Sequence, residues 1–407
     1  MLTTPKIAII GAGPSGLTLA RILYSKGLQT ITVFEGEASR HVRSQGGSLD
    51  LHPTSGQLAL KEGGIYDQFL KHARVEGQDL KLADRDGKVW LNVADRDTGK
   101  PEIDREKLRD ILLDSLPNGI VQWGKRVKSV DVELEDERPQ GLVRFEDGSQ
   151  ESGYDLIVGA DGAWSKVRPL VTHIPPFYSG VAGIDIRLDE ADTRHSEISK
   201  MVGRGSYFVF GEEERRVLLC QRNGDGSIRI YAVGSAPESW VKGPGYDFDD
   251  VEAVQKAFLN DYGSWAPEHK RIFEDLNFKE GDSITPRALY MLPVGLKWPT
   301  RVGVTLLGDA AHLMTPFAGQ GVNQAMQDGM ELALCILASL DDLTTAVRKY
   351  EEDMFPRAQQ WTQRTWDSLQ ARFAPGGIAG FCTMFKDRVK KEEKAVEFKE
   401  NDYIAET

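Results

Sequence analysis

The chain has 407 residues, of which 40% are hydrophobic and 28% charged, and its formal net charge is -12. This length exceeds one typical domain, so we expect two domains or one domain with a large insertion. The negative charge argues against a nucleic-acid partner, because phosphate binding requires clustered Lys and Arg, and the dense run at 386–394 mixes both signs.

The first predicted element is a buried parallel strand over residues 6–10, which leads into the turn Gly11-Ala-Gly-Pro-Ser-Gly16 and a helix over residues 17–24. In this order of elements, Gly11 supplies the tight turn, Gly13 lets the backbone approach a pyrophosphate, and Gly16 allows close helix packing. The N-terminus of the helix then lies against the phosphate charge. The turn therefore predicts a dinucleotide site.

A second predicted strand, over residues 30–34, ends in Glu35. Its carboxylate follows the glycine turn at about the spacing where the motif places an acceptor for a ribose 2′-hydroxyl. Because an acceptor at this position disfavours a 2′-phosphate, we expect an adenine dinucleotide of the FAD or NAD type.

Alternation of strands and helices continues to about Thr172 and includes a buried strand at 155–160, which ends in Asp161-Gly162. From about Pro175 to Ala288 the pattern becomes β-rich. The predicted elements there are strands at 206–210, 216–220 and 227–233, a hairpin turn at 223–226 and a helix near 251–262.

The buried-strand pattern returns at 302–307, runs into Gly308-Asp309 and is followed by a long helix from about Gly321 to Leu340. Beyond about Thr344 we predict terminal helices, interrupted at 375–377. The sequence thus predicts an α/β fold: a discontinuous Rossmann-like nucleotide-binding domain, an inserted β-rich substrate domain and C-terminal helices. The predicted bounds are 1–174 and 289–343 for the nucleotide-binding domain, 175–288 for the insertion and 344–407 for the C-terminal segment.

Three segments together resemble the fingerprints of class A FAD-dependent aromatic monooxygenases, the para-hydroxybenzoate hydroxylase-like group. They are the glycine turn, the DG segment Gly159-Ala-Asp161-Gly162-Ala-Trp-Ser165-Lys-Val-Arg168, and the GD segment from Gly308 to Asn323. They occur in the family's order and span most of the chain. Within this group, the stretches 46–52, 102–113, 165–168 and 308–323 most resemble the tetracycline-inactivating flavin monooxygenases.

By this resemblance the nucleotide is FAD, and the first domain is a FAD-binding domain. Asp309 would hydrogen-bond the ribityl chain of the flavin, Arg105 and Asp50 would contact the cofactor, and Arg43 would lie where NADPH or NADH docks as transient reductant. A helix that begins near Gly321 would direct its N-terminal dipole toward the flavin edge that becomes negative on reduction. The alternatives are a helix-capping role for Asp309 and a surface salt bridge for Arg43.

The residues that we expect to bind the cofactor come from all of these segments. They are Gly11, Gly13, Pro14, Ser15, Gly16, Glu35, Arg43, Gly47, Asp50, Arg105, Arg109, Asp161, Gly162, Gly308, Asp309, Pro316, Gly319, Gly321, Val322 and Asn323.

The inserted segment departs from the tetracycline enzymes, which hold their drug with a Gln, an Arg and a His. Our alignment places Gly183, Gly205 and Arg229 at these positions. Because a site built to hydrogen-bond a polar ligand loses heavily when partners vanish, another aromatic or polycyclic, phenol-like substrate is favoured over tetracycline. The substrate-side candidates, which also fit a packing role, are Arg187, Tyr207, Phe208, Phe210, Arg229, Tyr231, Met291 and Phe317.

The resemblance implies a monooxygenase mechanism. NADPH or NADH would reduce FAD, dioxygen would add at the flavin C4a atom, and the hydroperoxide would transfer one oxygen atom to the substrate. The flavin carries this chemistry, so no protein nucleophile or metal is required, and the protein excludes water and orients the substrate. His52 and His312 are weak acid–base candidates, with a structural role as the alternative for each.

Four alternatives remain at this point. A tetracycline-inactivating hydroxylase proper is one. A flavin halogenase shares the glycine turn, but its WxWxIP segment is absent here. A NAD dehydrogenase would account for the motif at residues 11–35 but not for the segment at residues 308–323. A non-catalytic flavin or ligand-binding protein would bind its ligand without consuming NADPH. The sequence leaves open hydroxylation, epoxidation and Baeyer–Villiger insertion, and NADPH versus NADH.

The three cysteines, Cys220, Cys335 and Cys382, are far apart and form no CxxC or zinc spacing, which is typical of free thiols in a reducing cytosol. The first strand begins within a few residues of the N-terminus and leaves no room for a signal peptide. No apolar run approaches membrane-spanning length. We expect a cytoplasmic monomer whose partners are a small-molecule substrate and O2.

Overall fold

The computed structural model describes residues 4–42, 46–94, 97–136, 138–242, 250–277 and 282–386. Arg43, the predicted nicotinamide contact, lies outside the described residues, as does the charged run from residue 387 on. The cysteines Cys220, Cys335 and Cys382 are free thiols. In the described ranges, no helix is both long enough and apolar enough to cross a membrane.

The chain divides into two compact units, each built from separate segments. The first unit comprises Met1–Gln78, Arg96–Ser179 and Leu289–Trp366, and the second comprises Asp79–Asp95, Gly180–Ala288 and Asp367–Thr407. The second unit therefore takes in two segments, one at 79–95 and one beginning at Asp367, that the sequence did not assign to the insertion.

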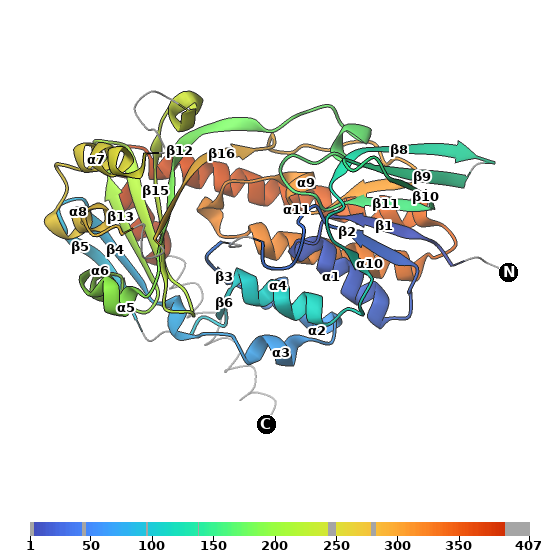
Figure 1. The fold of residues 1–407 in the computed structure, drawn as a ribbon, viewed down its shortest axis with the longest axis horizontal. Coiled ribbons are helices and arrows are strands. Elements are labelled where there is room, and N and C mark those ends of the chain that lie inside the picture. Colours follow the sequence, from blue (N-terminus) through green and yellow to red (C-terminus); the bar gives the residue numbers. More distant parts are fainter. Residues whose placement is uncertain are drawn as a thin grey trace, which may run out of the picture. The chain divides into compact units, whose positions relative to one another are not determined.

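A parallel sheet forms the centre of the first unit, with strand order β17-β11-β1-β2-β7 among the described residues. Figure 1 labels β1, β2 and β11 of this sheet. The strands are β1 (Ile7–Ile10), β2 (Ile31–Phe34), β7 (Val121–Gln122), β11 (Leu156–Gly159) and β17 (Val304–Leu306). β17 pairs with β11 although the two strands are far apart in sequence. The unit is therefore discontinuous.

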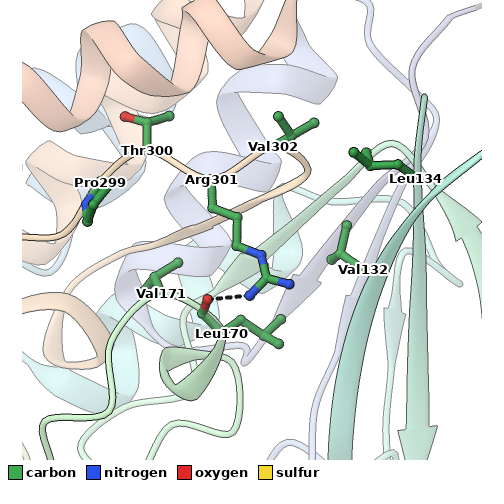
Figure 2. A pocket seen from close by; sticks show the side chains of 8 residues that line it. All are labelled: Val132, Leu134, Leu170, Val171, Pro299, Thr300, Arg301 and Val302. Atoms are coloured by element: carbon green, nitrogen blue, oxygen red, sulfur yellow. Dashed lines mark hydrogen bonds between the residues drawn. The ribbon is translucent and has the colours of Figure 1, made fainter. Parts of the chain in front are cut away.

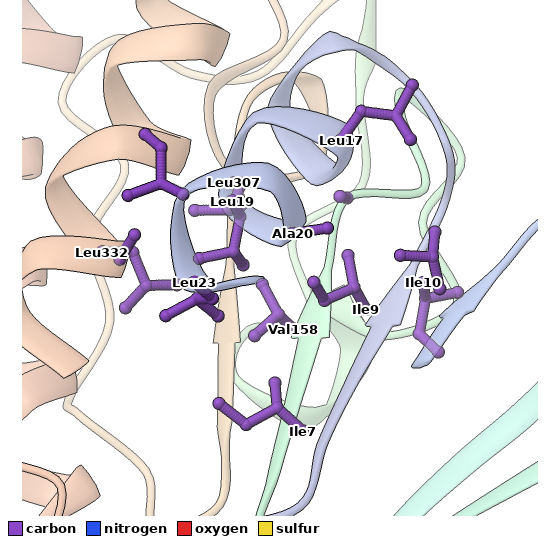
Figure 3. Close-up of a cluster of buried hydrophobic side chains, with 14 of the residues drawn as sticks. Ile7, Ile9, Ile10, Leu17, Leu19, Ala20, Leu23, Val158, Leu307 and Leu332 are labelled. Atoms are coloured by element: carbon purple, nitrogen blue, oxygen red, sulfur yellow. The ribbon is translucent and has the colours of Figure 1, made fainter. Parts of the chain in front are cut away.

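Strands β1, β11 and β17 are short, apolar and fully buried, as expected for parallel strands with both faces covered. Side chains of β1, including Ile7 and Ile9, lie in one cluster with Leu19 of α1 (Pro14–Ser25) and Leu332 of α10 (Gly321–Ala338) (Figure 3). The other helices of this unit are α2 (Gly56–Glu62), α3 (Tyr66–Leu70), α4 (Arg105–Asp114), α9 (Asp309–His312) and the start of α11 (Leu343–Arg372).

Two smaller sheets and several single turns complete the first unit. The sheets consist of β3 (Ser48–Asp50) with β6 (Glu102–Asp104), and of β8 (Val127–Glu135), β9 (Arg138–Phe145) and β10 (Gln150–Tyr154). The 3-10 turns are η1 (Glu76–Gln78), η2 (Arg168–Leu170) and η5 (Pro316–Ala318).

A mixed sheet forms the centre of the second unit, with strand order β16-β12-β15-β14-β13-β4-β5 in the part of the chain that the structure describes. The strands are β4 (Leu80–Asp84), β5 (Val89–Val93), β12 (Phe177–Leu188), β13 (Ser206–Gly211), β14 (Arg216–Arg222), β15 (Ile228–Ser235) and β16 (Ser283–Met291). The helical elements are α5 (Ala191–Arg194), α6 (Ser196–Val202), η3 (Glu238–Lys242), α7 (Val251–Asp261) and α8 (Pro267–Glu274).

The α/β fold class is confirmed. The predicted strands at 206–210, 216–220 and 227–233 are β13, β14 and β15, and the hairpin between β14 and β15 turns at Gly226 with φ +83°. Helix α10 begins at Gly321 as predicted. Helix α11 ends at Arg372 and residues 377–386 are helical again, which confirms the interruption at 375–377.

Helices α1 and α10 cross at a glycine. A Cβ atom at Gly329 would lie 2.5 Å from the carbonyl oxygen of Ser15 and 3.0 Å from the backbone nitrogen of Leu19. Because these neighbours are backbone atoms, they cannot move away cheaply. We expect Gly329→Ala to lower the free energy of unfolding by about 1–3 kcal/mol, measured by urea denaturation.

The matched control is Gly380→Ala, which also changes a helical glycine but has no heavy atom within 4 Å of the new Cβ. It should leave stability unchanged or raise it by up to about 1 kcal/mol through helix propensity. Equal losses in the two variants would contradict a steric role for Gly329.

Candidate functional site

The glycine turn after β1 combines close packing with one open position. Gly11 has φ +109°, and a Cβ there would lie 2.3 Å from the carbonyl oxygen of Ala160. A Cβ at Gly16 would lie 2.2 Å from the Gly11 oxygen, whereas one at Gly13 would meet nothing within 4 Å. Gly13 is the N-cap of α1, Pro14 follows it, and no side chain of the described residues caps the helix. The helix N–H groups beside this open space fit a pyrophosphate.

Glu35 and Arg109 hold this turn from behind. Glu35 accepts hydrogen bonds from the backbone N–H groups of Ala12 and Glu37, each at 2.9 Å. Arg109, which is buried, donates from Nε to the oxygen of Ala12 at 3.1 Å and from Nη1 to the Glu37 carboxylate at 2.8 Å. A carboxylate has about four acceptor positions, so Glu35 retains capacity for a ribose hydroxyl. Arg109 shapes the backbone rather than presenting its charge to solvent.

A buried amide connects α10 with the segment after β3. Asn323 is fully buried, and its Oδ1 accepts from the backbone N–H groups of His52 (2.8 Å) and Gly56 (3.4 Å) and from Ser55 Oγ (3.2 Å). Its Nδ2 donates to the oxygen of Asp50 at 2.8 Å. With both ends of the amide occupied by protein, Asn323 positions this loop. The sequence motif flagged the residue, and only the fold reveals these partners.

The DG segment follows β11. Asp161 accepts a hydrogen bond from the Lys166 backbone N–H at 2.6 Å, and its Oδ1 is buried with no partner among the described residues. Burial raises the pKa of this carboxyl, although hydrogen bonds from Ser165 and the backbone oppose the shift. Gly162 has φ +77° and open space beside it. An unsatisfied buried oxygen next to an open glycine fits a polar ligand.

Arg168 joins the DG and GD segments, a role that the sequence did not predict. It is buried, and it donates from Nη1 to the oxygen of Ala310 at 3.1 Å and from Nη2 to the oxygen of Ala163 at 2.5 Å. In the sequence, only its place in the DG motif singled out Arg168. Its two carbonyl partners, Ala163 and Ala310, lie far apart from each other in the sequence, so local patterns could not indicate that one side chain joins them.

In the GD segment, Asp309 differs from every other carboxylate described above. It is exposed, yet the protein around it raises its pKa through desolvation, opposed by the charges of His312 and Arg105. Among the described residues, no donor hydrogen-bonds this carboxylate. Gly308, not Asp309, is the N-cap of α9. An exposed carboxylate that still has its acceptor positions available fits the hydroxyl groups of a ligand.

His312 is held in a buried charge network. Its Nε2 lies 2.6 Å from Asp328 Oδ2, which also accepts from the Gly308 backbone N–H at 2.9 Å. Arg357 donates to the other oxygen of Asp328 at 2.7 Å. Burial alone would lower the pKa of His312, but the charge of Asp328 and its hydrogen bond raise it overall. The network anchors the backbone beside Asp309.

The predicted cofactor residues that are described all belong to the first unit. Their three glycine segments follow β1, β11 and β17, which are neighbours in the sheet, so the turns meet at its carboxyl edge. The backbone confirms this proximity: Leu307 N–H donates to Gly159 at 2.8 Å. Gly319 and Gly321, at the uncapped start of α10, have open space beside them.

The substrate-side candidates divide between the units: Met291 and Phe317 in the first, and Arg187, Tyr207, Phe208, Phe210, Arg229 and Tyr231 in the second. Tyr207 lies in the core under the helices, where its hydroxyl is 2.9 Å from His269 Nε2. By strand alternation Phe208 and Phe210 lie on the opposite face of the sheet. The Arg372 guanidinium lies over both rings, at 5.9 and 5.8 Å from their centroids. Tyr207 therefore does not share a face with the other candidates of β13.

A surface cavity of about 510 Å³ lies elsewhere in the first unit (Figure 2). Its lining residues are Val132, Leu134, Leu170, Val171, Pro299, Thr300, Arg301 and Val302. Figure 2 shows Arg301 directed at the oxygen of Leu170, to which Nη1 donates at 2.6 Å. The lining includes none of the predicted site residues, and it offers no glycine turn or helix N-terminus for a phosphate. The described residues contain no cluster of His, Cys, Asp and Glu that could hold a metal.

Comparison with known proteins agrees with this geometry. The family described as "FAD binding domain" matches residues 4–260 and 299–365. Monooxygenase penA of Penicillium thymicola is 33% identical, covering 91% of this chain and 96% of the relative. The structure of Klebsiella pneumoniae HpxO with FAD and uric acid has a TM-score of 0.75 at 22% identity, covering 94% of this chain and 93% of that chain. Tetracycline destructase Tet(51) has a TM-score of 0.69 at 19% identity, covering 98% and 97%.

Removing the Asn323 amide should loosen the loop at residues 50–56. We expect Asn323→Ala to lower the free energy of unfolding by about 1–3 kcal/mol, because buried donors and acceptors lose their partners. The variant should also retain less FAD after gel filtration. Gln327→Ala is the matched control: this residue lies one turn later on α10 and bonds only Glu331 (2.7 Å) among the described residues. Similar losses in both variants would contradict the positioning role.

The His312–Asp328 pair should give a pH-dependent stability. The pKa of His312 in the folded protein is raised above the ordinary histidine value of 6.5, so its stabilisation is complete below about pH 6.5 and is lost as the pH rises through the raised pKa. We expect His312→Leu to cost about 3 kcal/mol or more at pH 6 and less at pH 9. Urea unfolding of both proteins across this range tests it, and a pH-independent difference would contradict a charged His312.

Proposed function

Because the chain belongs to the FAD-binding domain family and is a FAD-dependent monooxygenase, we propose that it uses NADPH or NADH to insert one oxygen atom into an aromatic or polycyclic small molecule. The observation that carries the proposal is Asp309: an exposed carboxylate that accepts no hydrogen bond from the described residues, beside the glycine segments at one edge of the sheet. Its surroundings suit a ligand with several hydroxyl groups and a diphosphate.

Each segment of the proposed site has a group that could contact one part of FAD. The open turn at Gly13 and the N-terminus of α1 would hold the diphosphate, and Glu35 would accept from a ribose hydroxyl. Asp309 would accept from the ribityl chain, and the start of α10 would face the negative edge of the reduced ring. When bound, FAD supplies the redox chemistry, accepting hydride from the nicotinamide and activating O2 for transfer of one oxygen atom.

The protein's own contribution is to hold, orient and shield. Asn323 and Arg168 fix two walls of the site through buried hydrogen bonds. His312 is committed to Asp328, and His52 to Asp50 at 2.9 Å, so we assign both histidines to positioning rather than proton transfer.

Substrate residues are proposed for both units: Arg187, Phe208, Phe210, Arg229, Tyr231, Met291 and Phe317. Position 183 supports a substrate other than tetracycline. A Cβ at Gly183 would lie 2.1 Å from the oxygen of Ala232, so no side chain fits where the tetracycline enzymes carry a Gln anchor. Tetracycline hydroxylation remains the second candidate because the chain shares its fold with a tetracycline destructase.

The test is oxidation of NADPH and NADH by the FAD-loaded protein under air, with phenolic polycycles and a tetracycline added singly. We expect a non-tetracycline compound to accelerate oxidation and to gain the mass of one oxygen atom. Asp309→Ala should weaken FAD binding about tenfold or more, because a hydrogen bond to a charged group is lost. Bound FAD that neither nicotinamide reduces would replace the proposal with a non-catalytic flavin-binding protein.

A further inference from the structure

The hairpin of β8 and β9 has one apolar face, which lies beside the loop that leads into β17. Leu134 is opposite Pro139 across the hairpin, and Val132 shares their face because side chains alternate along a strand. A Cβ atom at Gly303 would lie 2.6 Å from Pro139 and 2.9 Å from Val132, so this end of the face packs against the loop. Leu134 lies farther along the strand and is 60% exposed. The apolar face therefore extends beyond the part that the protein covers.

The surface cavity of about 510 Å³ in the first unit begins at this exposed part of the hairpin. Its other sides are formed by Leu170 with Val171 and by the loop at 299–302 (Figure 2). Apart from Thr300 and Arg301, the lining side chains are apolar. A concave site with mostly apolar walls and few polar groups is typical of small-molecule binding. The shape therefore favours a small ligand over a flat protein surface.

Arg301 is the one charged residue that lines the cavity. Its side chain is exposed and reaches from the loop to the oxygen of Leu170, to which Nη1 donates at 2.6 Å (Figure 2). Within the described ranges Arg301 forms no ion pair, and a carbonyl oxygen does not neutralise a guanidinium. The other N–H groups of Arg301 remain available in the planar arrangement that suits a carboxylate.

The carboxylates on the elements around the cavity lie outside its lining. Asp131, Glu133 and Glu135 alternate with the lining residues of β8, so they lie on the opposite face of the hairpin. Asp136 is in the turn of the hairpin. Glu351 of α11 is buried and accepts a hydrogen bond from a loop threonine at 2.6 Å, and burial raises its pKa, which favours its neutral form. The cavity thus combines apolar walls with one positive charge.

We propose that this cavity is a binding site for a small apolar monocarboxylate, whose carboxylate pairs with Arg301. The apolar part of the ligand would cover Leu134 and the neighbouring valines, and the guanidinium would select an anion over a neutral molecule of the same shape. The inference goes beyond the proposed function, because the lining contains no residue assigned to the cofactor or to the substrate.

The test is calorimetric titration of the FAD-loaded protein with octanoate and with octanamide, which have the same chain and differ in charge. We expect octanoate to bind more tightly. Arg301→Gln should weaken octanoate binding about tenfold or more and leave octanamide binding unchanged, because only the charged pair is lost. Arg301→Lys should keep part of the preference, since it retains the charge but not the planar fork.

Leu134→Ser separates the apolar contact from the charge. Because Leu134 is exposed, its replacement should leave the fold intact. The variant should bind octanoate and octanamide more weakly by the same factor, about threefold or more, because apolar contact is lost with both probes. Unequal losses in this variant would contradict a ligand chain that lies on the apolar face of the hairpin.

Arg138→Gln is the matched control. Arg138 is an exposed arginine of the same hairpin, but it is opposite Glu135 and therefore lies on the polar face. Its variant should bind both probes as the unchanged protein does. A wild-type protein without octanoate preference overturns the proposal, and so does an Arg301→Gln variant that keeps the preference, because octanoate would then bind elsewhere.

Sedimentation of the same variants tests whether a second copy of the chain occupies the cavity instead. Self-association of the wild-type protein that Leu134→Ser abolishes would assign the apolar face to a protein contact and overturn the proposal. Titration with octanoate requires no turnover, so a failure of NAD(P)H oxidation would count against the monooxygenase function alone.

Discussion

The contact between the backbones of Gly11 and Ala160 is the constraint on which the site depends. The carbonyl of Ala160 occupies the space that a Cβ on Gly11 would need, so the turns after β1 and β11 can meet only without a side chain there. β17 is the next strand in the sheet, and its turn carries Asp309 to the same edge. Three distant segments thus become one wall because parallel strands align their carboxyl ends.

Holding that edge requires buried charge, and Asp328 shows how the chain compensates it. Asp328 is fully buried but has His312, Arg357 and the Gly308 N–H as partners, which together lower its pKa against the effect of burial. An uncompensated buried charge would cost several kcal/mol. Asp309, next to Gly308, accepts no hydrogen bond in the described part of the chain, although the charges of His312 and Arg105 favour its ionised form, so its exposed oxygens stay available for the hydroxyl groups of a ligand.

The sequence predicted what is locally encoded and missed what depends on distant pairing. The glycine turn, Glu35 and the start of α10 follow from spacing along one segment, and the structure has these elements where they were expected. β4 pairs in parallel with β13 across more than a hundred residues, and nothing in the local pattern of residues 80–84 indicates that partner. The ion pair between Asp328 and Arg357 could not be predicted for the same reason, because its two residues lie on different helices. Tyr207 and Phe208 are adjacent aromatic residues, so the sequence does not tell which one faces a ligand. The structure places Tyr207, and not Phe208, in the buried core cluster of the unit.

The two parts of the proposed site differ in what a substitution changes. In the proposed cofactor site, the contacts would come from backbone N–H groups and from turns whose glycines tolerate no side chain. Few substitutions there would therefore leave cofactor binding unchanged. On the inserted sheet the proposed substrate residues are side chains of one face, and their helix-facing neighbours form the core of the unit. Asp185 is buried and pairs with both Arg229 and Arg287, so its loss would remove one carboxylate from two guanidinium groups.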